Sequence, residues 1–383
     1  MNTFLLENIR IVTGDAIKTG YGIFVQEGKI AAIYPQSKRP QNTIGVSIYD
    51  GKNAYALPGL IDLHIHGFAG HGPELGSVKE LLAMSAELAR HGVTSFCPTL
   101  YCAKPDEMEA LLTKLAPAFG NETGAKMIGF HLEGPFISPA KPGVMKPQDI
   151  APADVNVLEK LYAAAQGHIA AMTLAPEVPN AAPVIEFCKA RGILMQAGHT
   201  NATYEELLQA AAQGVRHSTH LFNAMSPFTH RAPGAAGAIL MTPGISCEII
   251  ADGVHVHPAV VSFLQRVKPA DKIALVTDAL LPTAQPNGPF YANGEEVVFE
   301  GGVWKRKSDK VIAGSALTMA RGVKNLVDFG YSLSQAAQCA STNPAQIIGL
   351  QDTGKLEPGF RADIALLDDA FAPVQTFIDG KAV

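Results

Sequence analysis

Residues 58–67 read Pro-Gly-Leu-Ile-Asp-Leu-His-Ile-His-Gly, a short apolar run that ends in two histidines separated by one residue. Its length and composition are typical of a buried parallel strand, which we expect over Leu60–His64. Alternate residues of an extended strand point to the same side. His64 and His66 are therefore predicted to face one point at the end of this strand.

Seven further apolar runs follow the first, and helical patterns lie between most of them. The other expected strands are Val93–Pro98, Met127–Leu132, Ala170–Leu174, Ile193–Ala197, His217–Leu221, Cys247–Ala251 and Ile273–Thr277. Helical apolar spacing covers Val78–His91, Pro183–Arg191 and Tyr204–Gln213, and Thr203 with Glu206 forms a capping box. Eight strands alternating with helices predict an α/β fold of the (β/α)8 barrel type. A doubly wound open sheet is the alternative.

Both ends of the chain carry short β-rich runs bounded by turn residues. The expected strands are Ile9–Thr13, Gly22–Gln26, Lys29–Tyr34, Ala362–Leu367 and Val374–Ile378. Neither end has enough strands for a stable core of its own. We therefore predict one small β-sandwich built from residues 1–56 and 350–383, beside a catalytic barrel over residues 57–349.

The composition limits the classes of protein that this chain can be. Its 383 residues are 47% hydrophobic, which is enough for a large core, and the net charge of -5 favours neither nucleic acid nor an anionic membrane as partner. The five scattered cysteines form no C-x-x-C pair, which favours a reducing compartment. Residues 1–8 show no basic leader, and no run approaches the roughly 20 apolar residues of a membrane span. We expect a soluble cytoplasmic protein.

Polar side chains recur where the later strands are expected to end, namely Glu133, His199, His220 and Asp278. The carboxyl ends of barrel strands meet at one face, so these residues should gather with the two histidines of the first strand. Histidine and carboxylate are ligands for divalent zinc or iron, which activate water and polarise a carbonyl. The pattern predicts one metal ion or a close pair, with Asp278 as the group that moves the proton.

Each of these residues has a simpler explanation when it is taken alone. A single His-x-His pair is common in cores and on surfaces, and Asp278 could cap a helix. His199 could be a turn residue after Gly198, and Glu133 could lie on a turn before Gly-Pro. The order His-x-His, Glu, His, His, Asp at successive strand ends favours the metal site.

Eight segments, several of them long, surround these residues. They are Pro58–Gly67, His131–Phe136, Leu174–Glu177, Ala197–Thr203, Thr219–Met225, Ile250–His255, Leu275–Ala279 and Ala313–Met319. Through them nearly the whole chain resembles the N-acetylglucosamine-6-phosphate deacetylase family of the amidohydrolase superfamily. The resemblance implies metal-dependent hydrolysis of N-acetylglucosamine 6-phosphate to glucosamine 6-phosphate and acetate, in amino-sugar catabolism or cell-wall recycling.

The resemblance also implies a role for each residue of the predicted metal site. Glu133, His199 and His220 would be the core metal ligands, and Asp278 matches the catalytic aspartate. Some family members lack the two histidines of the first strand, so their presence here suggests a second metal position. The implied cofactor is a divalent metal, one or two ions per subunit, with zinc preferred over iron.

Further positions match the family's substrate contacts. They are Val144, Asn223, Ala224, Arg231, His255, Ile312, Ala313 and Gly314. Arg231 and His255 would hold the phosphate, which suits the bidentate fork of a guanidinium. In the family the arginine crosses a dimer interface, so the resemblance implies a homodimer in which Arg231 enters the neighbouring active site. A solvated loop charge is the alternative for Arg231.

The chain departs from the family pattern at two places. The loop after Glu-Gly-Pro usually reads Lys-Gly-Ala-His, and its histidine contacts the substrate, whereas residues 141–145 read Lys-Pro-Gly-Val-Met. Met145 cannot donate a strong hydrogen bond, so another donor, the second metal or a different substrate is implied. Ala232 follows Arg231 where an acidic residue is common.

Three other functions are compatible with parts of this pattern. The same chemistry could act on N-acetylgalactosamine 6-phosphate or another N-acyl amino-sugar phosphate. A cyclic-amide hydrolase of the dihydroorotase type usually carries a metal-bridging lysine, whereas this chain offers Glu133 on the third strand. An inactive scaffold on the same barrel would have lost ligands, and here the set is complete.

Overall fold

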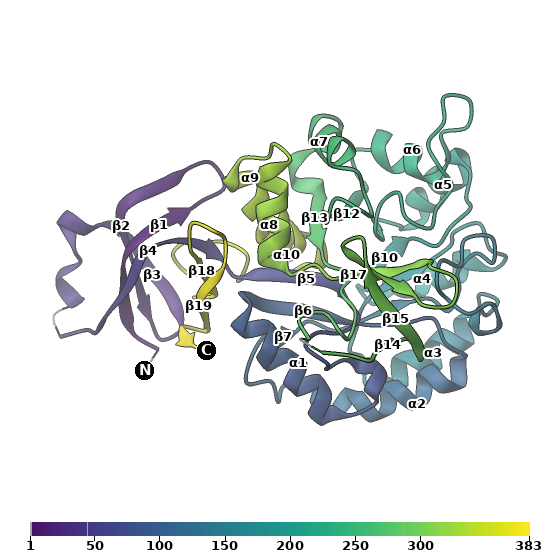
Figure 1. The fold of residues 1–383 in the computed structure, drawn as a ribbon, viewed down its shortest axis with the longest axis horizontal. Helices are drawn as coiled ribbons and strands as arrows, with labels where there is room; N and C mark the ends of the chain where they lie inside the picture. Colours follow the sequence, from purple (N-terminus) through teal and green to yellow (C-terminus); the bar gives the residue numbers. More distant parts are fainter. Residues whose placement is uncertain (1, 44, 286) are drawn as a thin grey trace.

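Eight parallel strands form the centre of the larger part of the molecule (Figure 1). The computed structural model describes residues 2–43, 45–285 and 287–383. In sheet order the strands are β5 (Leu60–Ile65), β6 (Val93–Leu100), β8 (Phe130–Glu133), β9 (Ile169–Leu174), β10 (Leu194–Ala197), β11 (His217–Ser218), β12 (Ser246–Ile250) and β13 (Ile273–Val276). The short strand β7 (Lys126–Met127) pairs with β6, so the third expected strand is divided into β7 and β8.

The last strand of this sheet returns to the first. The backbone N–H of Asp278 donates to the carbonyl of His64, and that of His66 donates to Ala279, each at 2.9 Å. Asp62, buried within β5, accepts the hydroxyl of Thr277 at 2.6 Å across the same seam. These bonds close the sheet into a barrel, which confirms the predicted fold and excludes the open doubly wound sheet.

Helices cover the outside of the barrel (Figure 1). They are α1 (Val78–Arg90), α2 (Pro105–Leu115), α3 (Val155–Ala164), α4 (Ala181–Ala190), α5 (Tyr204–Gln213), α6 (Gly234–Met241), α7 (Pro258–Val267), α8 (Met319–Asp328), α9 (Leu333–Ala337) and α10 (Asn343–Ile348). The three helices expected from apolar spacing are present, and the capping box of Thr203 and Glu206 begins α5. Short 3-10 turns lie at Gln36–Lys38, Gln41–Thr43, Pro73–Leu75, Ala116–Ala118, Pro147–Asp149 and Ala270–Lys272, with a π-turn at Gln338–Thr342.

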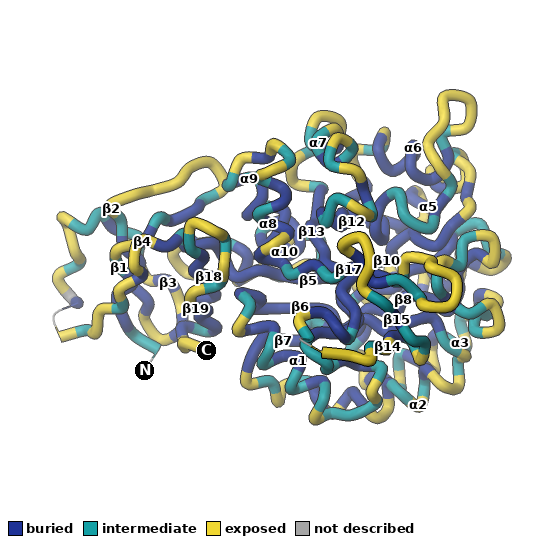
Figure 2. Tube along the Cα trace, viewed as in Figure 1, coloured by how far each residue is buried: buried dark blue, intermediate teal, exposed yellow. Residues whose placement is uncertain are grey.

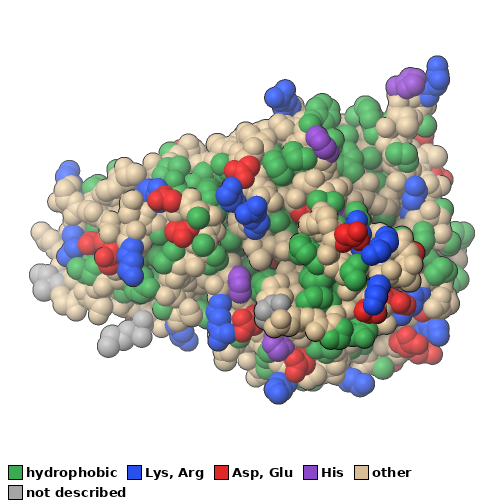
Figure 3. Space-filling model, viewed as in Figure 1, with side chains coloured by type: hydrophobic (Ala, Val, Ile, Leu, Met, Phe, Trp, Pro, Cys, Tyr) green, Lys and Arg blue, Asp and Glu red, His purple; other side chains and the backbone are tan. Residues whose placement is uncertain are grey.

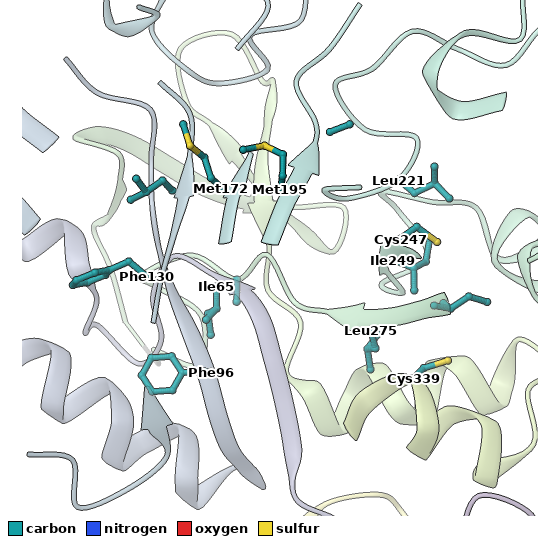
Figure 4. Packing of buried hydrophobic residues seen from close by; sticks show 14 of the residues in the cluster. Ile65, Phe96, Phe130, Met172, Met195, Leu221, Cys247, Ile249, Leu275 and Cys339 are labelled. Carbon is teal, nitrogen blue, oxygen red and sulfur yellow. The ribbon is translucent and has the colours of Figure 1, made fainter. Parts of the chain in front are cut away.

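Apolar side chains of the barrel strands pack against these helices as one continuous core. Figure 4 shows members of this cluster from β6, β8, β10, β12 and β13, namely Phe96, Phe130, Met195, Ile249 and Leu275. All five are at most 2% exposed. A core of this kind makes the barrel a rigid support for the loops at its carboxyl end.

The two ends of the chain join in one seven-stranded mixed sheet beside the barrel (Figure 1). Its strands are β3 (Lys29–Pro35), β2 (Ile17–Gln26), β1 (Phe4–Val12), β4 (Ile48–Pro58), β18 (Ile364–Leu367), β19 (Pro373–Ile378) and β20 (Lys381–Ala382), in sheet order. Its core includes Phe4 and Phe377, whose stacked rings lie 4.9 Å apart, and Figure 2 shows this interior as buried. The predicted small β domain from both termini is thus confirmed, whereas its strands β4 and β20 were not expected. The division of domains at residues 56 and 350 stays a prediction.

A four-stranded antiparallel sheet is inserted after the eighth barrel strand, and the sequence did not indicate it. It consists of β14 (Phe290–Ala292), β15 (Glu295–Glu300), β16 (Val303–Arg306) and β17 (Ile312–Ser315). A bridge between Ala279 and Ser315 ties β17 to the end of the barrel. The insertion therefore brings residues 312–314 to the mouth of the barrel.

The surface shows no concentration of one charge on the face drawn in Figure 3, where acidic and basic side chains are interspersed. Among the residues that the structure describes, no helix combines the length and the apolar character needed to cross a bilayer.

Candidate metal centre and active site

The predicted metal ligands meet at the carboxyl end of the barrel. Within reach of one another are His64 in β5, His66 just after it and Glu133 at the end of β8, together with His199 and His220, which lie two residues beyond the ends of β10 and β11. All five are at most 4% exposed. Side chains that are far apart in sequence are thus brought to one rim, as the sequence predicted.

One group of ligands surrounds the first oxygen of Glu133. Its Oε1 lies 3.1 Å from Nε2 of His199 and 3.1 Å from Nε2 of His220. The two imidazole nitrogens are themselves 3.1 Å apart. Three ligand atoms at such separations define a single compact site.

A second group shares the same carboxylate. Glu133 Oε2 lies 3.2 Å from Nε2 of His66, which is 3.3 Å from Nε2 of His64. Asp278 directs its Oδ1 at both histidines, at 3.5 Å from His64 and 3.4 Å from His66. Glu133 therefore lies between the two groups: its Oε2 faces His66, whereas its Oε1 faces His199 and His220 and is also 3.5 Å from His64 Nε2.

The donor set fits a divalent cation. His199 donates from Nδ1 to the carbonyl of Lys141 at 3.0 Å, and His64 donates from Nδ1 to Glu248 at 2.9 Å. An imidazole that binds a metal is neutral and has one N–H, so in both rings Nε2 would be left as a lone pair directed into the cluster. Lone pairs facing one another are satisfied by a cation between them. Imidazole with carboxylate is typical of zinc and of other divalent transition metals.

The electrostatics of the cluster also favour a positive charge at its centre. Burial lowers the pKa of His64, but the negative charges of Glu248, Glu133 and Asp278 outweigh burial and raise it to about 10. Burial would raise the pKa of Asp278, yet His64 and His66 hold it below its ordinary value. Asp278 is therefore ionised at neutral pH and able to accept a proton.

Glu248 is a part of the site that the sequence reasoning missed. It lies inside β12 and is fully buried, and its Oε2 accepts from His64 Nδ1 and from the backbone N–H of His220, both at 2.9 Å. Burial raises the pKa of Glu248, but the neighbouring His64 outweighs it and lowers the pKa to about 2. A charged residue in the middle of an apolar strand needs a buried partner. This requirement could have identified Glu248 from the sequence as a candidate part of the site.

Glu248→Gln tests whether this carboxylate supports the metal site. We expect metal affinity to fall about 10- to 100-fold, because a carboxylate behind a ligating histidine fixes its tautomer and raises its basicity. Chelator competition measures the affinity, and Glu296→Gln, at a half-buried position of β15 outside the cluster, is the control. Unchanged affinity in Glu248→Gln would show that Glu248 only fills the core.

Three residues of the cluster adopt left-handed backbone conformations. The φ angles of His199, His220 and Asp278 are 46°, 24° and 50°. Such angles cost a non-glycine residue on the order of 1–3 kcal/mol each, and they persist where the surrounding fold enforces them. The turn that follows each of these strands thus directs the side chain of the left-handed residue into the mouth of the barrel.

The cluster opens into a cavity of about 140 Å³. Four of the five predicted metal ligands line it, namely His66, Glu133, His199 and His220. Seven of the eight predicted substrate contacts line it as well: Val144, Asn223, Ala224, His255, Ile312, Ala313 and Gly314. Arg231 is the exception, since it is exposed and lines a separate cavity with Thr203 and Tyr204. Within one subunit, Arg231 is therefore not brought to the cavity of Asp278.

The loop at residues 141–145 closes one side of the cavity. Gly143 has a φ of 57°, and a Cβ there would lie 3.1 Å from Cε1 of His199. The loop can approach the ligand so closely because this position is glycine. Met145, in place of the family's histidine, is 3% exposed and packs in an apolar cluster with Tyr101.

Tyr101 is a second residue of the cavity that the sequence reasoning did not identify. It directly follows β6, and its ring stacks on His66 with centroids 3.8 Å apart and an interplanar angle of 4°. Burial raises its pKa well above the ordinary value, and the carboxylates of Glu74 and Asp278 add to the effect. Its hydroxyl is therefore protonated at neutral pH.

Comparisons with known proteins agree with this geometry. Residues 55–383 match the model of the amidohydrolase family. The chain is 34% identical to an N-acetylglucosamine-6-phosphate deacetylase of Bacillus subtilis (strain 168), over 99% of this chain and 96% of the relative. It is 32% identical to an N-acetylgalactosamine-6-phosphate deacetylase of Escherichia coli O157:H7, over 99% of each.

A solved structure shows the same fold over the full length. It is a mutant N-acetyl-D-glucosamine-6-phosphate deacetylase from Mycobacterium smegmatis in complex with N-acetyl-D-glucosamine-6-phosphate. The TM-score is 0.91 at 28% identity, covering 99% of both chains. The fold, the ligand cluster and these similarities lead to one assignment: the chain belongs to the N-acetylglucosamine-6-phosphate deacetylase family of the amidohydrolase superfamily.

Proposed function

We propose that this protein hydrolyses the acetamide of N-acetylglucosamine 6-phosphate to glucosamine 6-phosphate and acetate. The observation that carries the proposal is the position of Asp278, whose carboxylate faces the histidine cluster at the wall of a cavity that also contains His255. The acetamide can be attacked at the histidine cluster while His255, at another wall of the same cavity, holds the phosphate. The relatives described above support this substrate class.

In the proposed mechanism, His64, His66, Glu133, His199 and His220 would hold the metal. A divalent ion held there would lower the pKa of a water and polarise the acetamide carbonyl. Asp278 accepts the proton of the attacking water and later delivers it to the leaving amine nitrogen. The tight cavity holds the amide against Asp278, since seven sugar-contact residues enclose the rest of the substrate.

His255 is proposed to bind the phosphate as an imidazolium. Its Nδ1 donates to Asp252 at 2.6 Å, and its side chain is 6% exposed. Burial lowers the pKa of His255, but the hydrogen bond and charge of Asp252 outweigh burial and raise it. The positive charge therefore persists to higher pH than that of an ordinary histidine.

The KM for the phosphorylated substrate should stay low at neutral pH and rise as the pH passes above the raised pKa of His255. His255→Gln should raise KM about 10- to 100-fold, because hydrogen bonds to charged groups contribute roughly 1.5–3 kcal/mol. Asp252→Asn should move the rise in KM to lower pH. Steady-state KM against pH measures both effects, and an identical profile in Asp252→Asn would contradict the assignment.

We also propose a homodimer in which Arg231 completes the neighbouring site. Arg231 lies outside the cavity of its own subunit, which supports this arrangement. Co-expressing Arg231→Ala with Asp278→Asn should restore about a quarter of the active sites, since half of the dimers are hybrids with one intact site. Activity that stays at the level of the separate variants would exclude an Arg231 shared between subunits.

A second candidate substrate is N-acetylgalactosamine 6-phosphate, which the Escherichia coli relative supports. The deciding experiment compares kcat/KM for both sugar phosphates, and for a cyclic amide, on metal-loaded protein. A higher value for N-acetylglucosamine 6-phosphate supports the proposal. A higher value for the galactosamine epimer would replace the substrate and keep the chemistry, and turnover of the cyclic amide alone would overturn both.

The proposal places the reaction in the cytoplasm. The five cysteines, Cys97, Cys102, Cys188, Cys247 and Cys339, are all free and buried, which suits a reducing compartment.

A further inference from the structure

Tyr101 lies where two cavities meet. It lines the catalytic cavity and also a neighbouring cavity of about 470 Å³, and no other described residue lines both. The neighbouring cavity has apolar walls from Leu75, Ala103, Leu111 and Leu281, and polar groups from Glu74 and Lys146. The Tyr101 side chain therefore forms the partition between the two spaces.

This partition is rigid. One face of the Tyr101 ring stacks on His66, a proposed metal ligand, at 3.8 Å. The ring also belongs to a buried apolar cluster that contains Ile137, Met145, Leu280 and Trp304. Only 8% of the residue is exposed, so the ring is held by the side chains packed around it.

The proposed reaction fixes which part of the substrate faces this wall. The acetamide carbon must lie beside Glu133 and Asp278, while the sugar phosphate extends toward His255. The substituent on that carbon then points to the remaining walls of the cavity near His66, which are Tyr101 and Met145. Both walls are apolar, as a methyl group requires.

We infer that Tyr101 is a specificity-determining residue that closes the acyl end of the catalytic cavity and restricts the enzyme to short N-acyl groups. This inference rests on the proposed function. Longer acyl chains are excluded by the ring of Tyr101, although space for them exists directly behind it.

The test compares N-acetyl-, N-propanoyl- and N-butanoyl-glucosamine 6-phosphate on the metal-loaded wild type, Tyr101→Ala and Tyr101→Phe. The wild type should prefer acetyl over butanoyl by at least about 100-fold in kcat/KM, since one methylene at a closed wall costs about 10-fold or more. Tyr101→Ala joins the cavities and should reduce that preference by at least about 10-fold.

Tyr101→Phe is the matched control, because it keeps the wall and removes only the hydroxyl. That oxygen is buried and has no hydrogen-bond partner within the described chain, so the acyl preference should stay within about twofold of wild type. If Tyr101→Ala loses metal or fails to fold, Tyr101→Val and Tyr101→Leu provide smaller apolar walls. These two variants should also prefer acetyl over butanoyl less strongly than the wild type does.

Three results separate the inference from the proposed function. A wild type that hydrolyses the butanoyl substrate as well as the acetyl one overturns the inference, whatever the variants do. A metal-loaded Tyr101→Ala that turns over the acetyl substrate with unchanged preference also overturns it. Absence of acetyl hydrolysis in the wild type removes the proposed function itself.

Discussion

Asp278→Asn should lower kcat by about 10³- to 10⁴-fold while the metal content stays at the wild-type level. General acid–base catalysis contributes roughly 10²- to 10⁴-fold, and Asp278 is proposed to act both as base and as acid. The carboxylate lies 3.4 Å from His66 Nε2, and the pKa of Asp278 is lowered by the neighbouring histidines despite burial. An amide of the same shape preserves the packing and cannot accept the proton.

The measurement combines acetate release with metal analysis of the same protein sample. Asp271→Asn, on an exposed 3-10 turn, is the matched control and should leave both quantities unchanged. Loss of metal in Asp278→Asn would make the aspartate a ligand. Retained turnover with full metal content would remove the proton-transfer role of Asp278.

Glu133→Gln should remove most of the bound metal and lower kcat/KM on the order of 10⁴-fold or more. Its carboxylate contacts both histidine groups, at 3.1 Å from His199 and His220, 3.2 Å from His66 and 3.5 Å from His64. Loss of the negative charge of Glu133 should weaken metal binding by both histidine groups at once. A metal ion supplies several kcal/mol of transition-state stabilisation, and about 1.36 kcal/mol corresponds to tenfold in rate.

Metal stoichiometry also distinguishes one site from two. His66→Ala should remove one equivalent of metal if the wild type binds two ions, and none if only the His199 and His220 group is filled.

A Glu133→Gln protein with unchanged metal content would show that the imidazoles alone bind the ion. Glu177→Gln, whose carboxylate accepts from Thr200 and Asn201 outside the cluster, is the control.

The barrel was predictable because its strands are buried on both faces. Such strands are continuous apolar runs, so Leu60–Ile65 and Ile169–Leu174 are visible without knowledge of their neighbours. The inserted sheet has no such pattern. In β15, Glu295–Glu300, three of six residues are glutamates and the strand depends on partners in β14 and β16.

The histidine and carboxylate cluster was predictable for a related reason, since each of its residues lies at or just beyond the carboxyl end of a barrel strand. Glu248 escaped notice because it lies within its strand, and only the packing of β12 beside β11 and His64 shows its partner. Tyr101 escaped because β6 extends to Leu100, two residues beyond the expected end. Its stacking on His66 depends on a register between β5 and β6 that spacing does not specify.

The small sheet has an implication for how the chain matures during synthesis. β18 lies between β4 and β19, although β4 precedes the barrel and β18 follows it. A ribosome therefore releases the whole catalytic region before β4 can gain its neighbour Ile364–Leu367. Until then the hydrogen-bonding edge of β4 is open, and a nascent chain stalled before residue 364 should be a substrate for chaperones that bind extended segments.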